Sequence, residues 1–177
     1  MRLVGLAALL MAAVMPGAQP ERPRIPRAAL APLERSLDAS LTKPGQQYPF
    51  DPLGNTRAVY LKGYGVVFTT ELNLLVAPRI TPFNQFVSKE DVEKTHRQKL
   101  ANLEALKKAM RELLATSAAS LDALPPNEQI VVAVTLFYYS WEQKAGLPSQ
   151  ILMQASKGAL VKGGGPALNA AVRVEEL

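Results

Sequence analysis

The fold is decided by one stretch, Val87–Leu124, which reads VSKEDVEKTHRQKLANLEALKKAMRELLATSAASLDAL. Ser88 suits a helix N-cap, and Asp91 three positions later completes a capping box. Apolar residues then recur with the spacing of one helical face: Leu100, Leu103, Leu106, Met110, Leu113, Leu114, Ala118 and Leu121. A pair of prolines follows the stretch and prevents the helix from continuing. The sequence therefore predicts one long amphipathic helix with a single buried face.

Strands are expected on both sides of this helix. Arg57–Leu75 alternates apolar and polar residues around a glycine-rich turn, which predicts a β-hairpin. Ile130–Trp141 is apolar on both faces and rich in β-branched and aromatic residues, which is typical of a central strand. Ser149–Ala155 is expected to be a second strand, although a helix beginning at Pro148 would also fit the pattern. A short amphipathic helix, Leu30–Leu41, precedes all of these elements.

The expected order is β-β-α-β-β behind a short N-terminal helix. This predicts an α+β fold in which the long helix packs across a small antiparallel sheet. A helix of about 33 residues is roughly 50 Å long, whereas strands of nine residues span about 30 Å. The helix must therefore either break near Ala115–Ser120 or extend beyond the sheet. An overhanging apolar face needs a cover, for which we expect the Leu30–Leu41 segment; the alternative is a homodimer through the Ser88–Leu121 helix.

The N-terminal segment suggests that the protein is exported. Residues 1–18 combine a positive start, an apolar run of about a dozen residues and a small-residue end, as in a secretory signal peptide. That run is too short to span a membrane, which takes roughly 20 residues. We expect a Pro-rich linker over 19–29, a single domain over 30–162 and a flexible Gly-rich tail over 163–177. With no cysteine among 177 residues, a bacterial periplasmic or secreted location fits best.

The composition argues against several kinds of chemistry. His96 is the only histidine and cysteine is absent, so neither a metal site nor a cofactor is expected. The net charge of +5 is mild, and the long helix carries many pairs of opposite charges at i, i+4 spacing. We therefore expect no nucleic-acid partner. Ser40 and Lys43 match a Ser-x-x-Lys pattern, but the companion motifs of penicillin-interacting enzymes are missing.

Aromatic residues give the strongest indication of a binding surface. In a strand, Tyr139 and Trp141 would share one face with Phe137, and that face needs a cover, a partner or a ligand. Tyr60 and Tyr64 of the first hairpin are expected as neighbours. One interpretation is that both faces of the run pack within the core. The other, which gives the predicted binding site, is an aromatic groove formed by Tyr60, Tyr64, Tyr139 and Trp141 that would bind an unidentified protein or small ligand.

Three segments resemble a group of exported bacterial proteins of uncharacterised function. They are Val59–Phe68 (VYLKGYGVVF), Ser120–Asp122 (SLD) and Pro126–Val131 (PNEQIV), and the resemblance covers about 55–155. It implies an exported bacterial lineage, and it implies no activity, cofactor or site residue.

The sequence is therefore interpreted as an exported α+β domain that acts through binding or assembly. The main alternative is a small hydrolase that uses a serine or a carboxylate. Its first candidate residues would be Asp122, Asn127 and Glu128, at the corner between the helix and the following strand. A third interpretation is an envelope scaffold tethered by its Pro-rich segment.

Overall fold

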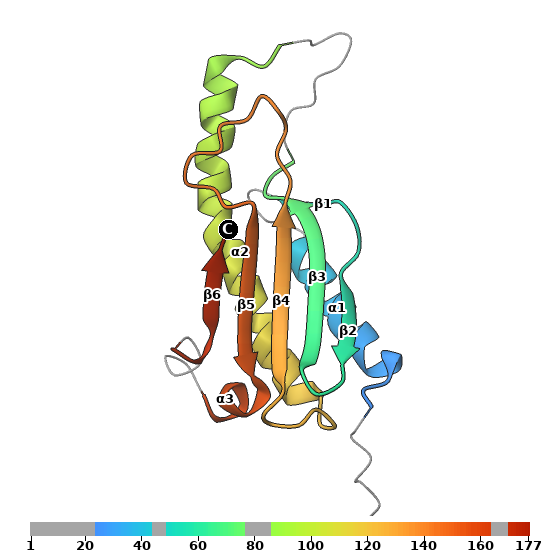
Figure 1. Ribbon diagram of the computed structural model, residues 1–177. Coiled ribbons are helices and arrows are strands. Elements are labelled where there is room, and N and C mark those ends of the chain that lie inside the picture. The colour runs from blue at the N-terminus through green and yellow to red at the C-terminus, as the bar shows by residue number, and fades with distance from the viewer. Residues whose placement is uncertain (1–23, 44–48, 77–85, 164–169) are drawn as a thin grey trace, which may run out of the picture.

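The computed structural model describes residues 24–43, 49–76, 86–163 and 170–177 (Figure 1). Six strands form one sheet and the helices accompany it, which confirms the α+β class. In chain order the elements are α1 (Arg27–Leu41), β1 (Asp51–Pro52), β2 (Arg57–Leu61), β3 (Gly65–Asn73), α2 (Lys89–Ser120), β4 (Gln129–Leu136), β5 (Gln150–Ser156), α3 (Lys157–Lys162) and β6 (Arg173–Glu176). The expected signal peptide, and residues 19–23 of the expected linker, lie outside the described residues.

The sheet is mixed rather than antiparallel. Its strands follow the order β1-β3-β4-β5-β6, and β2 also pairs with β3. β3 and β4 are parallel, with Val66 opposite Ile130, while β2–β3, β4–β5 and β5–β6 are antiparallel. The expectation of an all-antiparallel sheet was wrong because α2 carries the chain back along the sheet, so that β4 starts at the same end as β3.

The hairpin of β2 and β3 is confirmed, and its turn explains a required glycine. Gly63 and Gly65 have φ angles of 81° and 142°, a region that favours glycine. A Cβ atom on Gly65 would lie 1.8 Å from the carbonyl oxygen of Gln129. Gln129 N in turn donates to Tyr64 O at 2.7 Å. The turn thus joins the hairpin to the start of β4 through a close backbone approach.

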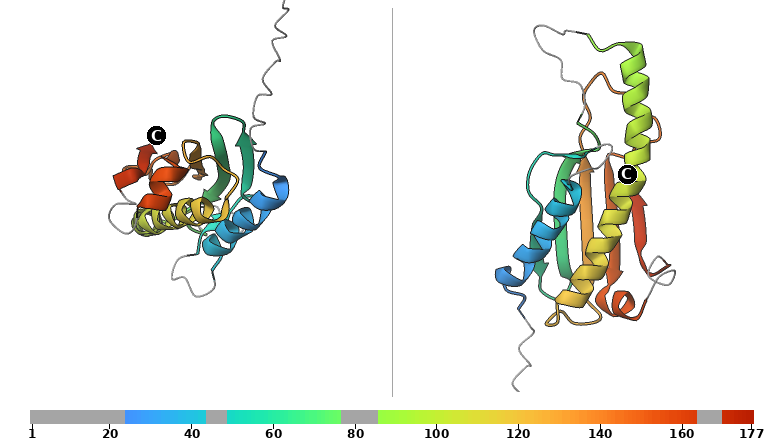
Figure 2. Two further views of the ribbon diagram at one scale, coloured as in Figure 1. Left: turned by 90° about the horizontal axis from the view of Figure 1, so that it is seen from below. Right: turned by 180° about the vertical axis from the view of Figure 1, so that it is seen from behind.

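Both long helices cover one face of the sheet (Figure 2). Alternate residues of the central strands, such as Phe68 and Val132, face the helices and are fully buried. They pack with the apolar faces of α1 and α2, for example with Leu37 and Leu114. Fully burying such side chains stabilises the fold by about 1.5–3 kcal/mol each. No helix of the described residues covers the opposite face of the sheet (Figure 2), and its β2 residue Val59 is 50% exposed.

α2 is one unbroken helix of 32 residues that extends beyond the sheet (Figure 1). The predicted N-cap is confirmed, because Ser88 Oγ accepts a hydrogen bond from Asp91 N at 3.0 Å. α1 packs against α2 beside residues 109–116, over the sheet, so the expectation that Leu30–Leu41 covers the overhang was wrong. The overhanging N-terminal half is covered instead by the β4–β5 loop, since His96 Nδ1 lies 3.0 Å from the Gln143 carbonyl oxygen.

α1 also protects the β2 edge of the sheet. Asp38 Oδ1 accepts from Thr56 N at 2.9 Å, and Glu34 Oε1 accepts from Ala58 N at 2.6 Å. Glu34 is buried and forms an ion pair with Arg27. Two carboxylates one helical turn apart thus occupy backbone donors that an added strand would otherwise use.

The domain is longer at both ends than 30–162. At the N-terminal end, α1 begins at Arg27, and Ile25 before it is 8% exposed in the core. At the C-terminal end, the expectation of a flexible tail is corrected, because β6 joins the sheet and Val172 is buried. β5 is a strand as expected, and the short helix α3 follows it directly. Across the described parts of the chain, no helix combines the length and apolar character needed to cross a membrane.

Candidate functional site

The candidate site lies on an arm that projects beyond the sheet (Figure 1). We define the arm as the N-terminal half of α2 together with the β4–β5 loop, residues 137–149. At its base, Leu136 N donates to Ser149 O at 2.8 Å and Phe137 N donates to Leu72 O at 2.9 Å. Beyond these bonds the loop leaves the sheet and runs beside α2 (Figures 1 and 2).

The aromatic run is therefore in the arm and not in a strand. The prediction that β4 continues to Trp141 was wrong, because pairing stops at Leu136. Tyr139 nevertheless contacts both Phe137 and Trp141. The rings of Phe137 and Tyr139 are 5.1 Å apart and edge-to-face, and those of Tyr139 and Trp141 are 6.0 Å apart and parallel.

We call these three side chains the aromatic ladder. Phe137 is 37% exposed, and Tyr139 and Trp141 are half-buried, so the ladder reaches the surface. Such pairs of rings contribute about 0.5–1.5 kcal/mol beyond the apolar area they bury. The ladder is thus ordered by its own contacts while keeping part of its area accessible.

A buried ion pair joins α2 to the loop that carries the ladder. Lys99 Nζ donates to Glu142 Oε2, and the two side chains are 0% and 1% exposed. Lys99 Nζ also lies 4.8 Å from the ring centroid of Tyr138, within the range of a cation–π interaction. The Tyr138 hydroxyl donates to Pro148 O at 2.7 Å. The contacts of Lys99 join the loop to the helix, and the Tyr138–Pro148 bond joins the two ends of the loop.

The burial of this cluster shifts two pKa values. Burial lowers the pKa of Lys99, and the hydrogen bond and charge of Glu142 oppose that shift. Burial, followed by the negative charge of Glu142, raises the pKa of Tyr138 to about 12. Within the described part of the chain, Glu142 Oε1 is buried without a hydrogen-bond partner. Lys99 and Glu142 are closed to solvent, whereas Tyr138 is partly exposed, and the contacts of all three support the arm.

The other buried contacts of the arm are also polar. Thr95 and Asn102 are buried on the same side of α2 as Lys99, and Asn102 Nδ2 donates to Leu74 O at 2.6 Å. Farther along α2, over the sheet, the buried residues are apolar, for example Leu106 and Met110. The helix thus changes its buried face from polar to apolar where the arm meets the sheet.

The four predicted binding residues do not form one groove. Tyr139 and Trp141 lie together on the arm, after the last residue of β4. Tyr60 and Tyr64 lie at the opposite end of the sheet, where Tyr64 O binds Gln129 N at the first residue of β4. Tyr64 is 44% exposed in the turn, whereas Tyr60 is half-buried between β2 and the helices.

The corner between α2 and β4 contains Asp122, Asn127 and Glu128, and its contacts join parts of the fold. Asp122 and Asn127 are exposed, while Glu128 is 5% exposed and its Oε1 accepts from the Tyr60 hydroxyl at 3.3 Å. Glu128 Oε2 is buried without a hydrogen-bond partner among the described residues. The Lys157 ammonium donates to three carbonyl oxygens after α2, at 2.8 to 3.0 Å. The corner thus joins helix, β2 and α3, and its three polar residues do not converge on one point.

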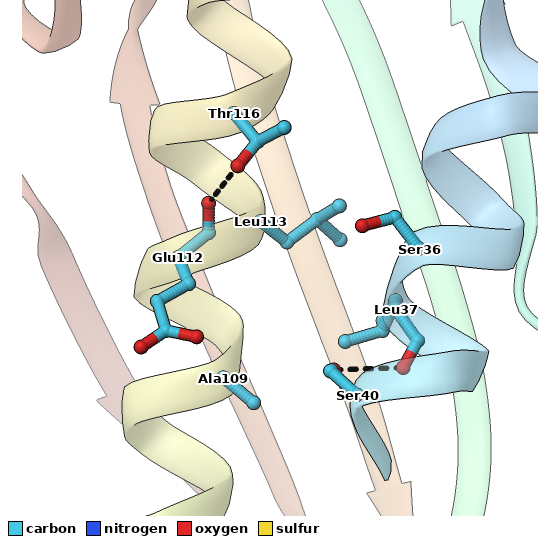
Figure 3. Close-up of a pocket in the computed structure, with 7 residues that line it drawn as sticks. All are labelled: Ser36, Leu37, Ser40, Ala109, Glu112, Leu113 and Thr116. Atoms are coloured by element: carbon cyan, nitrogen blue, oxygen red, sulfur yellow. Dashed lines mark hydrogen bonds between the residues drawn. The ribbon is translucent and has the colours of Figure 1, made fainter. Parts of the chain in front are cut away.

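A groove of about 100 Å³ lies between α1 and α2 (Figure 3). It is lined by Ser36, Leu37, Ser40, Ala109, Glu112, Leu113 and Thr116. The Ser40 hydroxyl donates to Leu37 O and the Thr116 hydroxyl to Glu112 O, each at 2.8 Å. These hydroxyls are directed at the backbone of their own helices, and the groove gathers no set of polar groups around one position. In the described residues no group of three or more metal-ligating side chains occurs.

The sequence analysis named Tyr139 and Trp141 but missed the pair of Lys99 and Glu142. Lys99 was not singled out, because lysine in a helix is usually exposed. The spacing offered a signal: Thr95, Lys99, Asn102, Leu106 and Met110 follow one another at three or four residues on one face. Comparison of the chain with protein-family models, curated proteins and solved structures finds no match.

Proposed function

We propose that this protein is an exported binding module and that the aromatic ladder on its arm is its partner-binding surface. The observation that carries the proposal is the ladder itself: three aromatic side chains in two consecutive ring contacts, partly exposed on a projecting loop. Tryptophan and tyrosine are the residues most enriched at the energetic centres of protein interfaces. The proposed partner is therefore another protein, with the arm as the element that reaches it.

The attachment of the loop to α2 favours a surface that is ordered before it binds. A surface that is ordered before it binds loses less conformational entropy on association. The contacts of Lys99 with Glu142 and Tyr138 hold the loop on α2 before any partner arrives. Phe86, just before α2, is 84% exposed and adds a further apolar side chain to the same end of the molecule.

The test uses a photo-crosslinking amino acid at one of two tyrosines. One variant carries benzoylphenylalanine in place of Tyr139 on the arm, and its control carries it in place of Tyr64, which is exposed at the opposite end. Both variants are expressed in a bacterial envelope and irradiated. We expect a discrete protein adduct from position 139 and none from position 64. Adducts from position 64 alone, or from neither position, would contradict the proposal.

A direct measurement uses Trp141, the only tryptophan of the chain. Once an adduct identifies a partner, its titration should change Trp141 fluorescence with saturation, because the indole is half-buried in the ladder. The Tyr139→Ala variant should weaken binding by about 2 kcal/mol, the size typical of an interface centre. Unchanged affinity in that variant would place the binding surface elsewhere.

A further inference from the structure

The two edges of the sheet differ in how their outward backbone groups are satisfied. At the β2 edge, α1 carboxylates accept from Thr56 N and Ala58 N. At the β6 edge, Leu177 and Gln150 exchange two hydrogen bonds, at 3.0 and 3.1 Å. Because bonded pairs alternate in an antiparallel ladder, Arg173 and Glu175 also face β5, and Val174 and Glu176 face away from it. Within the described residues, the backbone groups of Val174 and Glu176 have no partner.

We propose that the β6 edge pairs with the β6 edge of a second copy of this chain, in antiparallel orientation across a two-fold axis. The sheets of the two copies would then form one continuous sheet. An isologous contact of this kind is the commonest way in which a soluble protein forms a closed oligomer.

The charges of β6 select one register for this pairing. With the two-fold axis at Val174, Arg173 stands directly opposite Glu175 of the second copy, and this pair occurs twice. Axes at Arg173 or at Glu175 would instead place like charges opposite each other. Arg173 and Glu175 lie on the open face of the sheet, 70% and 35% exposed, and pair within the chain at 2.8 Å. The edge is therefore complementary to itself in one register only.

The helix-covered face is compatible with the same register. Val174 is half-buried against the core at this edge, so the two copies of its side chain would meet on the axis. Glu176 on this face forms an ion pair with Lys107 of α2, at 2.7 Å. That contact joins the edge strand to the long helix and keeps β6 in place when a neighbour pairs with it.

Such a dimer would direct its two arms away from each other. β6 and β4 run in the same direction, because each is antiparallel to β5. The two-fold axis reverses the second copy, so the two aromatic ladders lie at opposite ends of the continuous sheet. Resting on the function proposed above, the dimer would be a bivalent connector between two copies of the partner.

Sedimentation velocity of the purified protein tests the pairing. We expect a dimer at about 100 μM. Val174→Pro, which removes an N–H directed away from β5, should give a folded monomer, whereas Val174→Ala keeps that N–H and should leave the dimer intact. A monomeric wild-type protein, or a dimer that persists in Val174→Pro, would overturn the proposal.

A charge exchange tests the register without changing the backbone. Arg173→Glu should weaken the dimer by about tenfold, because it places like charges opposite each other twice. The double variant Arg173→Glu with Glu175→Arg restores opposite charges and should recover the wild-type dissociation constant. Failure of the double variant to recover it would overturn the register. These results depend on oligomeric state alone, so they are independent of whether the ladder binds a partner.

Discussion

Replacing Lys99 by methionine should loosen the arm from the sheet-bound part of the molecule. The substitution keeps the length of the side chain but removes its charge, and leaves Glu142 buried and unpaired. Breaking a buried ion pair by removing one partner costs about 3–5 kcal/mol. The Lys99 and Glu142 side chains are 0% and 1% exposed, so the pair is fully buried and this energy range applies to it. We therefore expect a loss of about 3 kcal/mol or more in the free energy of unfolding.

The matched control is the same substitution on the same helix. Lys108 is 80% exposed, and its contact with Glu112 is 4.0 Å long, so Lys108→Met should cost less than about 0.5 kcal/mol. The double variant Lys99→Met with Glu142→Leu removes both charges and should come within about 1 kcal/mol of the wild type. These three variants separate the unpaired charge from the change in packing.

Urea unfolding provides the assay, with two signals followed together. Trp141 fluorescence reports on the arm, because this residue precedes Glu142, and far-ultraviolet circular dichroism reports on the whole fold. If the arm opens first in Lys99→Met, the fluorescence transition will precede the dichroism transition. A Lys99→Met variant as stable as Lys108→Met by both signals would refute the buried pair as the support of the arm.

Three further outcomes follow from other contacts. Since burial raises the pKa of Tyr138 to about 12, the native state holds a proton that the unfolded chain releases near 10, so stability should fall between these pH values. Tyr138→Phe should remove the late-titrating tyrosine from a spectrophotometric titration. The hydrogen bond from Arg27 lowers the pKa of Glu34, so the contribution of Glu34 to stability is present above about pH 4.5 and is lost as the pH falls through the native pKa. Glu34→Gln should therefore reduce the fall of the urea unfolding midpoint at acid pH. An unchanged fall would contradict the assignment. Gly65→Ala should destabilise the protein by about 3 kcal/mol or more in the same assay, because the new Cβ would clash with Gln129 O, whereas Gly54→Ala has open space and should be neutral.

Local patterns predicted the elements that depend on local physics. The N-cap at Ser88 follows from a hydroxyl that can reach an N–H three residues on, and the hairpin follows from alternation around Gly63 and Gly65. β5 was also recognised by its alternation. The α+β class then follows from combining one long helix with these strands.

The errors concern relations between distant residues. Whether β4 runs parallel to β3 depends on the path of α2 across the sheet, which no local pattern contains. β6 was missed because Arg173 and Glu175 are polar and its supports are distant in sequence: the pairing with β5 and the ion pair of Glu176 with Lys107. In the candidate site, the aromatic residues were identified, but the end of β4 at Leu136 moved them onto the arm. Lys99 was missed because its burial depends on a carboxylate 43 residues away.

The parallel pairing of β3 with β4 has a consequence for how the chain folds. The two strands at the centre of the sheet are separated by about 60 residues, so their contact has high sequence separation and forms late. The β2–β3 hairpin and α2 can form locally, on a timescale of microseconds. The hairpin and α2 can pack together only when the chain between β3 and β4 has folded back over the sheet. Until then the apolar faces of both elements stay exposed. For a chain exported as its sequence predicts, slow closure of this crossover would keep it unfolded long enough to cross a membrane before its core assembles.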